Sequence, residues 1–206
     1  MAEEIPSNKA ADAELVRRSL ESPDEFGHII AKYQEPLRRY VRRIARASAD
    51  DTDIILQDVF IKTYENLNDF DRDLAFSSWV YRIAHNESVD YLRRKKRGGS
   101  SLDDPAYDDE SVTLAETIAA DEDMTVEIDK QYLKGNVMAI LDKLDPQYRA
   151  VLVLRFLEER DYKEISDILR KPPGTIATLI HRAKKEFRRL AEEHKGRWEE
   201  GESKTL

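Results

Sequence analysis

Apolar residues in the first half of the chain recur every three or four positions, the spacing of one buried helix face. The pattern covers residues 26–44 and 55–67 and returns at the start of a third stretch from about 75 to 97. A polar break, NLNDFDRD, separates the second helix from the third, and Asp50 or Asp51 can cap the second helix. No alternation of apolar and polar residues is long enough to predict a strand. The first half is therefore predicted to be a small helical bundle.

The second half shows the same helical spacing between residues 126 and 156. One helix in this stretch ends at the sequence Leu-Asp-Pro. Asp145 followed by Pro146 is typical of an N-cap with proline at the first helical position, which predicts that a new helix begins there. Apolar residues continue in the new helix as far as Phe156.

A short helix, a tight turn and a longer basic helix follow. The segment YKEISDILR, residues 162–170, has the apolar spacing of a helix, and the sequence PPG at 172–174 prevents that helix from continuing. Thr175 is expected to cap the last helix, whose apolar residues recur at helical spacing from 176 to 190. Two helices joined by a tight turn, the second of them basic, are typical of a helix-turn-helix.

Charge is distributed unevenly along the chain. The formal net charge is -8, yet the stretch from Gly99 to Asp129 holds eleven Asp or Glu residues and no Lys or Arg. This acidic stretch is poor in aromatic residues and has too little apolar surface to fold alone. We therefore predict an all-α protein of two small helical domains, residues 12–97 and 129–195, joined by a flexible acidic linker at residues 98–128. On composition alone, the linker is equally well explained as a solvated tether.

Composition argues against several classes of function. The chain has no Cys, which excludes disulfides, thiolate zinc sites and cysteine nucleophiles and fits a reducing cytoplasm. The four His residues are dispersed, and no Walker lysine, HExxH or nucleophile elbow is present. The N-terminus lacks the features of a signal peptide, and there is no run of about 18 apolar residues. We expect a cytoplasmic protein with no membrane insertion, no cofactor, no metal and no catalytic residues.

The last helix carries the chemistry expected of a duplex DNA reader. Between Lys171 and Leu190 it has six Lys or Arg residues and one Glu. A helix fits the major groove, where its early residues reach base edges and its cations neutralise phosphates. We expect Thr178, His181 and Arg182 to lie nearest the bases, with Thr175 beside them. The residues better suited to phosphates are Lys171, Lys184, Lys185, Arg188 and Arg189. An ordinary amphipathic helix with a solvated basic face remains an alternative interpretation.

A second basic helix, FSSWVYRIAHNESVDYLRRKKR at residues 76–97, ends in five consecutive cations. It interleaves aromatic side chains with Arg and Asn, a combination suited to stacking on unpaired bases while the cations follow the phosphates. Trp79 and Phe76 could equally belong to a core. The five cations could be a solvated helix end, which the negative end of the helix dipole would favour.

Three stretches together resemble a known family. They are DDTDIILQDVF at residues 50–60, the 76–97 helix, and LDPQYRAVLVLRFLEERDYKEISDILRKPPGTIATLIHRAKKEFRRL at residues 144–190. In this order, and with the acidic linker between the second and the third, they are similar to a bacterial RNA polymerase sigma factor of the extracytoplasmic-function (ECF) group of the sigma-70 family. The resemblance covers about residues 12–192.

The resemblance implies a division of labour between the two domains. Residues 12–97 would dock on RNA polymerase core, mainly on the β′ clamp helices, and would capture the melted non-template strand of the downstream promoter element. Residues 129–195 would read the upstream element as duplex, and the acidic linker would run toward the RNA exit path. An anti-sigma factor is a possible further partner. The loop from Asn66 to Asp73 would correspond to the family's pocket for a flipped-out base, whose contacts must offset the cost of extruding that base.

The resemblance also assigns residues to these roles. Those implied for polymerase binding are Asp53, Gln57, Asp58 and Phe60. Those implied for the downstream element are Asn66, Asn68, Asp69, Trp79, Arg82, Asn86, Asp90, Arg93 and Arg94. Those implied for the upstream element are Lys171, Thr175, Thr178, His181, Arg182 and Lys185. The chain departs from the family pattern at Ile54, where an acidic residue is usual, and at Ala177 and Leu179, where cations are frequent.

Three other functions compete with this interpretation. A free-standing helix-turn-helix regulator would bind duplex DNA unaided, although the N-terminal half shows no sign of a sensor. A nucleic-acid enzyme could hold magnesium on Asp71 and Asp73, but acidic pairs in loops are usually solvated. A protein-docking scaffold would leave both cationic helices without a purpose.

Overall fold

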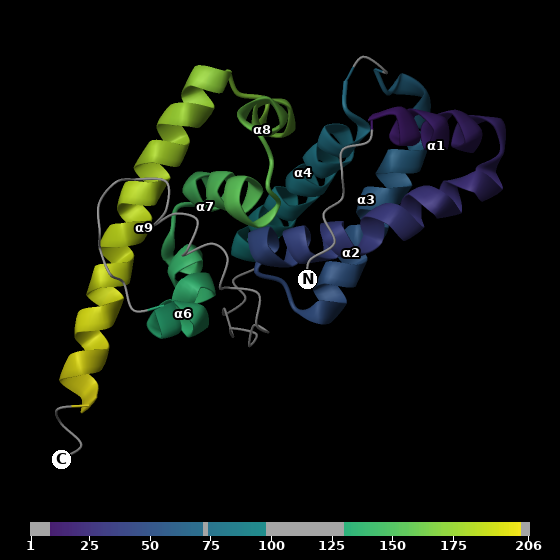
Figure 1. Cartoon of the computed structure of the whole chain (residues 1–206). Coiled ribbons are helices and arrows are strands. Elements are labelled where there is room, and N and C mark those ends of the chain that lie inside the picture. The colour runs from purple at the N-terminus through teal and green to yellow at the C-terminus, as the bar shows by residue number, and fades with distance from the viewer. Residues whose placement is uncertain (1–8, 72–73, 98–129, 203–206) are drawn as a thin grey trace. The chain divides into compact units, whose positions relative to one another are not determined.

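The structure, a computed structural model, describes residues 9–71, 74–97 and 130–202 (Figure 1). These residues form helices and turns and contain no strand, which confirms the predicted all-α class. They divide into two compact units: one holds the described residues up to Arg97 and the short segment Ser166–Arg170, and the other holds the rest of the described residues from Lys130 on. The predicted linker, residues 98–128, lies outside the described residues.

Four helices make up the first unit: α1 (Lys9–Glu21), α2 (Phe26–Ala45), α3 (Ala49–Glu65) and α4 (Phe76–Arg97). Helices α2, α3 and α4 each pack against the other two, and α1 packs on α2 and α4. The helices predicted from the apolar spacing at residues 26–44, 55–67 and 75–97 are therefore confirmed. Tyr33, Leu37, Tyr40, Val59 and Val80 lie fully buried between them. Burying side chains of this size contributes roughly 1.5 to 3 kcal/mol each.

Helix α1 was not predicted, because two of its three buried positions are polar. Asp12, Val16 and Ser19 are the buried residues of α1. The carboxylate of Asp12 accepts hydrogen bonds from the Tyr33 hydroxyl at 2.8 Å and from Lys32 Nζ at 2.7 Å, both on α2. A buried carboxylate is tolerated when it is paired and hydrogen-bonded in this way. Asp12 therefore ties α1 to α2.

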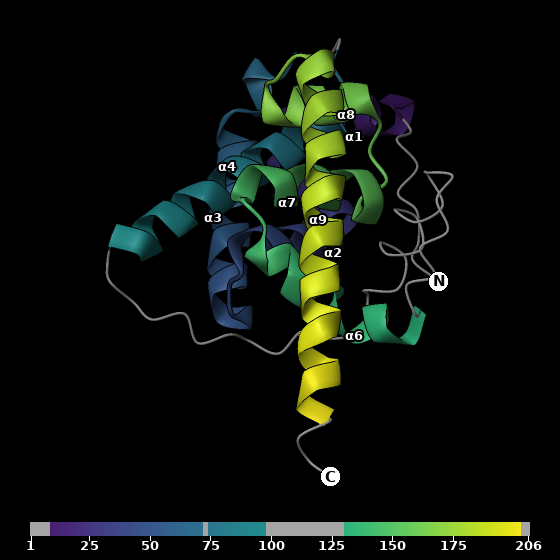
Figure 2. The same ribbon diagram turned by 90° about the vertical axis from the view of Figure 1, so that its left-hand side faces the viewer.

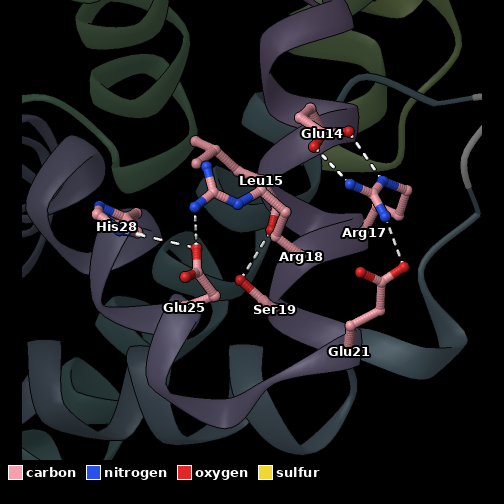
Figure 3. A network of polar contacts seen from close by, with 8 residues as sticks. All are labelled: Glu14, Leu15, Arg17, Arg18, Ser19, Glu21, Glu25 and His28. Atoms are coloured by element: carbon pink, nitrogen blue, oxygen red, sulfur yellow. Dashed lines mark hydrogen bonds and ion pairs between the residues drawn. The ribbon is translucent and has the colours of Figure 1, made fainter.

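Exposed ion pairs complete the junction between α1, α2 and the 3₁₀ turn η1 (Pro23–Glu25) (Figure 3). Arg18 Nη2 lies 2.5 Å from Glu25 Oε2, and His28 Nε2 lies 3.8 Å from the same oxygen. Arg17 bridges Glu14 and Glu21 along the outer side of α1, at 2.6 and 2.5 Å. Pairs exposed to this degree are worth little to stability, so Asp12 is the contact that matters most for the position of α1.

The residue that caps α3 differs from the prediction. Ser48, not Asp50 or Asp51, is the N-cap, and its hydroxyl oxygen accepts a hydrogen bond from the Asp51 backbone N–H at 3.1 Å. The hydroxyl proton of Ser48 is donated to the Asp51 carboxylate at 2.9 Å. Ser and Asp both cap helices well, and the helix begins at Ala49, one residue before the first Asp.

The second unit contains α6 (Lys130–Lys143), α7 (Pro146–Leu152), α9 (Pro173–Glu202) and the first half of α8 (Tyr162–Leu169). Helix α9 lies along α7 and α6, as Figures 1 and 2 both show. Asp145 caps α7 as predicted, with its carboxylate accepting from the Gln147 backbone N–H at 2.8 Å. Arg149 lies buried against the end of α6 and donates to the Leu141 and Asp142 carbonyls at 3.1 and 3.2 Å.

The connection from α7 to α8 begins with a π-helical turn, η3 (Val153–Leu157). Reciprocal hydrogen bonds then start α8: the Glu164 N–H donates to Asp161 Oδ1 at 2.7 Å, and the Asp161 N–H donates to Glu164 Oε2 at 2.9 Å. This is the capping-box arrangement, with Asp in place of Ser or Thr. The short helix predicted at 162–170 is thus confirmed.

Helix α9 begins three residues earlier than predicted. It starts at Pro173, and the Thr175 backbone N–H already bonds to the Pro172 carbonyl at 2.9 Å. Thr175 is therefore inside the first turn and is not the N-cap. Proline is well suited to this first turn because it lacks the N–H that would have no partner there.

Candidate nucleic-acid interface

One exposed face of α4 collects the residues predicted to meet single-stranded DNA. Arg82, Asn86, Asp90 and Arg93 follow one another at steps of four, four and three, so they share a side of the helix. Asn86, Asp90 and Arg93 are exposed and Arg82 is partly buried. Asp90 Oδ1 accepts from Arg93 Nη1 at 3.1 Å, and Arg94 lies exposed beside this pair. The face offers both amide and charged groups to a ligand.

Two contacts to α3 hold this face in place. The Tyr91 hydroxyl donates to Asp51 Oδ2 at 2.9 Å, and Lys62 Nζ lies 2.6 Å from the buried carboxylate of Glu87. Burial, together with the hydrogen bond to Asp51, raises the pKa of Tyr91 to about 12. Lys95 Nζ lies 5.8 Å from the centre of the Tyr91 ring. Tyr91, which the sequence offered as a stacking residue, is thus bound into the α3–α4 junction.

The predicted base pocket begins where α3 ends. Asn66 is the C-cap of α3, and its side-chain amide donates to the Lys62 carbonyl at 2.7 Å. Asn68 and Asp69 are exposed on the 3₁₀ turn η2 (Leu67–Asp69). The end of the predicted loop, at residues 72–73, lies outside the described residues. The exposed polar side chains of the described part of the loop are Asn66, Asn68, Asp69 and Asp71.

Trp79 lies in the core of the first unit, with 9% of its surface exposed. Its ring is 5.2 Å from Phe70 and 5.6 Å from Phe76, centre to centre. Such an aromatic cluster stabilises a fold beyond the area that it buries. Trp79 and Phe76 therefore belong to the core, which was one of the two alternatives for these residues. Trp79 would then affect DNA binding only indirectly, by stabilising the N-terminal end of α4.

Helix α9 presents a second exposed face. Thr175, Thr178, His181, Arg182 and Lys185 are all exposed, and Lys171, just before the helix, is partly buried. Ile176, Ile180, Ala183 and Phe187 are buried on the opposite side, as their spacing predicted. The structure therefore brings Thr175, Thr178, His181, Arg182 and Lys185 onto one side of α9, whereas Lys171 lies before the helix.

Two of the expected phosphate contacts on α9 are otherwise engaged. Lys184 is only 5% exposed, and its Nζ lies 5.9 Å from the centre of the Phe156 ring. Its assignment to phosphate is wrong, because the stem of the side chain is part of the core. Arg189 is held by Glu186 at 2.6 Å and by Glu193, and the hydrogen bond to Glu186 raises the pKa of Arg189 above its ordinary value.

The polymerase-binding residues predicted on α3 divide between surface and core. Asp53 and Gln57 are exposed, Asp58 is partly buried, and Phe60 is 9% exposed, so the Phe60 ring supports the helix from inside. The Asp53 carboxylate also forms an ion pair with Arg38 on α2.

Two exposed isoleucines flank these polar residues on α3. Ile54 and Ile61 are 57% and 55% exposed and lie seven residues apart, on either side of Gln57 and Asp58 on one face. The sequence singled out Ile54 as a departure from the family pattern, but Ile61 was not predicted to be exposed. The seven-residue spacing, read against the buried face of α3, could have found it.

The described residues give no support to metal chemistry. They contain no group of three or more His, Asp or Glu side chains placed to hold a metal ion. Asp73, one of the two residues considered for magnesium, lies outside the described part. Within that same part, no helix is both long and apolar enough to span a membrane.

Comparison with known proteins identifies both units. The family model "Sigma-70 region 2" matches residues 29–98, and "Sigma-70, region 4" matches residues 134–187. The ECF RNA polymerase sigma factor SigW of Bacillus subtilis (strain 168) is 33% identical over 170 residues, covering 81% of this chain and 88% of that protein. The chain belongs to the ECF RNA polymerase sigma factors. It is an alternative sigma factor, the class of protein that directs promoter recognition in transcription initiation.

Further relatives are similar to this ECF sigma factor along most of its length. The ECF RNA polymerase sigma-E factor of Escherichia coli (strain K12) is 30% identical over 182 residues, 86% of this chain and 93% of that protein. Two solved structures share the fold at a TM-score of 0.62: CnrH in complex with the cytosolic domain of CnrY, and the sigma factor RpoE in complex with the anti-sigma factor NepR from Bartonella quintana. They are 22% and 16% identical, and cover 90% and 82% of this chain and 97% of their own chains.

Proposed function

We propose that this ECF sigma factor grips a promoter at two points while it is mounted on RNA polymerase core. Residues 12–97 form the domain that docks on core, mainly on the β′ clamp helices, and holds the melted non-template strand. Residues 129–195 form the domain that binds the upstream element as duplex, and residues 98–128 connect the two. One observation carries the proposal. Each of the two matched regions has one exposed helix face whose side chains suit nucleic acid, on α4 in the first region and on α9 in the second.

The downstream face combines hydrogen-bonding and cationic groups. Asn86 and Asp90 can pair with base edges, whereas Arg93 and Arg94 can follow the phosphates of a single strand. Lys62–Glu87 and Tyr91–Asp51 fix α4 on α3, so the face is organised before DNA arrives. A face organised in advance loses less conformational entropy on binding.

The upstream face is a helix of the size that the major groove accepts, with Arg182 and Lys185 exposed along it. Arg182→Ala in full-length protein is expected to weaken holoenzyme binding to promoter DNA about tenfold, since one good base contact contributes about 1 to 3 kcal/mol. Affinity for core polymerase should stay the same. Arg189→Ala is the matched control on the same helix, because Arg189 is occupied by two glutamates and should matter less.

The experiment that tests the whole proposal is reconstitution with core polymerase. Start sites on a genomic library are mapped with core alone and with core plus the purified chain, and the same promoter fragments enter a gel-shift assay with the chain alone. We expect new start sites only with both components, and no specific shift with the chain alone. Specific binding by the chain alone, without any effect on start sites, would instead support a free-standing regulator.

The docking surface on core has its own test. Gln57→Ala with Asp58→Ala removes polar groups from the exposed side of α3 and should reduce retention of core polymerase in a pull-down. The Arg17→Ala variant on α1 serves as the control, because Arg17 pairs only with exposed glutamates of its own helix. Equal retention of core by all three proteins would remove α3 from the interface.

The solved relative RpoE is in complex with an anti-sigma factor, and we propose that an inhibitor of this type can also hold the present chain. The chain would act in the cytoplasm, where core polymerase is found, and without catalysis of its own, as a specificity subunit of the polymerase.

A further inference from the structure

The first two turns of α9 differ in chemistry from the rest of its exposed face. Residues 172–180 contain no charged side chain, and the first ionisable side chains of the helix, His181 and Arg182, come only in the third turn. Gly174, Ala177 and Thr178 are exposed in these turns. A Cβ added at Gly174 would meet no atom of the described residues within 4 Å, so there is open space beside Gly174 at this end of the helix.

The hydroxyl of Thr178 is already used. Its Oγ1 donates to the Gly174 carbonyl at 2.9 Å, one turn back along the helix. This bond consumes the only proton of the hydroxyl and fixes the side-chain rotamer, because the two heavy substituents of a threonine Cβ move together. With the oxygen held against the backbone, the methyl group is what Thr178 offers to a ligand. Ala177, its exposed neighbour, adds a second methyl.

We propose that the methyl groups of Thr178 and Ala177 read the upstream promoter element by contact with the C5 methyl of thymine. The inference rests on the proposed function, in which α9 enters the major groove. There the N-terminal residues of a recognition helix meet base edges, and the thymine methyl is the one apolar group that a base pair presents. The selected pair is therefore A·T, recognised without a hydrogen bond to the base.

Other kinds of contact between these turns of α9 and a base fit the geometry less well. Guanine is usually recognised by a bidentate Arg or Lys and adenine by a bidentate Asn or Gln, and residues 172–180 contain none of these. The Thr178 hydroxyl could donate to a base only after breaking its bond to the Gly174 carbonyl. A methyl–methyl contact needs no such rearrangement, and the burial of one methyl changes a binding constant about fourfold.

The test uses holoenzyme assembled from core polymerase and the full-length chain, with a labelled promoter fragment in a binding titration. Each thymine of the upstream element, on either strand, is replaced in turn by deoxyuridine, which lacks only the C5 methyl. We expect one or two positions at which affinity falls about fourfold per methyl. Replacement elsewhere in the element should leave affinity unchanged.

Two variants of Thr178 separate the methyl from the hydroxyl. Thr178→Val keeps a methyl and loses the hydroxyl, and it should remain sensitive to deoxyuridine at the same position. Thr178→Ser keeps the hydroxyl and loses the methyl, so it should bind the thymine promoter more weakly and lose that sensitivity. Circular dichroism verifies that both variants retain the helix content of the parent chain.

The outcomes distinguish this inference from the function on which it rests. The inference is overturned if no deoxyuridine position matters, or if Thr178→Val rather than Thr178→Ser abolishes the discrimination. If Arg182→Ala still weakens promoter binding in those cases, α9 remains the upstream reader and only the methyl contact is wrong. If Arg182→Ala has no effect either, the proposed role of α9 fails together with the inference.

Discussion

Lys62 on α3 and Glu87 on α4 form an ion pair of 2.6 Å in which the two partners are unequally exposed. The Glu87 side chain is 8% exposed, whereas that of Lys62 is 48% exposed. Removing the lysine would leave a buried carboxylate without its cation, which costs more than the pair itself contributes. The pair lies one residue from Asn86, so it also sets the place of the proposed DNA face.

Lys62→Met is therefore expected to lower the free energy of unfolding of the first unit by about 1 to 3 kcal/mol. Lys62→Met with Glu87→Met should restore most of the loss, because no buried charge is then left alone. Urea unfolding is followed by Trp79 fluorescence in a Trp198→Phe background, so that the signal comes from the first unit. A double variant as unstable as the single one would mean that packing, not charge, dominates at this contact.

His85 on α4 makes the first unit sensitive to acid. Its Nδ1 lies 3.0 Å from the hydroxyl of the buried Tyr40, and burial lowers the pKa of His85 to about 4 from an ordinary value of 6.5. Between these two values the unfolded chain binds the proton more readily than the folded chain does. The stability contributed by neutral His85 is therefore complete above pH 6.5 and is lost as the pH falls toward 4.

We expect the free energy of unfolding to fall by about 1 to 3 kcal/mol over that range because of His85. His85→Gln should flatten the dependence between pH 6.5 and 4, measured by the same fluorescence titration. His28→Gln is the control, since the His28 side chain is 61% exposed. An unchanged slope in His85→Gln would assign the acid sensitivity to carboxylates instead.

Arg149 has a comparable structural role in the second unit, where it satisfies the last carbonyls of α6. It donates to the Leu141 and Asp142 carbonyls, and its positive charge lies at the negative end of the α6 dipole. Arg149→Met keeps the length of the side chain and removes its donors, so it should destabilise this unit by about 2 to 4 kcal/mol. Lys143→Met, at the exposed end of the same helix, should change little. Urea unfolding followed by circular dichroism compares the two, and equal midpoints would contradict the capping role.

The helices that carry the proposed function were predictable because their apolar spacing is strong. The spacing from Phe26 to Ile44 and from Ile176 to Phe187 reports burial directly, and Asp145–Pro146 is an unambiguous start signal. Helix α1 gave no such signal, since Asp12 is buried through contacts with residues 20 and 21 positions away. Patterns of local spacing do not record a partner at that distance.

Which aromatic side chains face outward was harder to predict than which helices exist. Trp79, Tyr91 and Phe60 all lie on helices proposed to meet partners, yet their rings belong to the fold. The exposed large apolar side chains of α3 are instead Ile54, Ile61 and Tyr64. A large ring is buried wherever neighbouring helices leave room for it, and that depends on the packing of three helices rather than on one segment.

Ile54 and Ile61 lead to the last prediction, on the docking of core polymerase. They flank Gln57 and Asp58 on one exposed face of α3, and interfaces commonly place apolar anchors around a few polar groups. If α3 docks on core as proposed, Ile54→Ser and Ile61→Ser should each weaken core binding about five- to thirtyfold, because each removes about 1 to 2 kcal/mol of apolar burial. Stability should hardly change, since neither side chain is buried in the chain itself. Lys9→Ser on α1 is the control for a surface change away from this face. Competition for core against a labelled sigma factor measures the affinities, and wild-type values for both isoleucine variants would show that the polar residues dock without them.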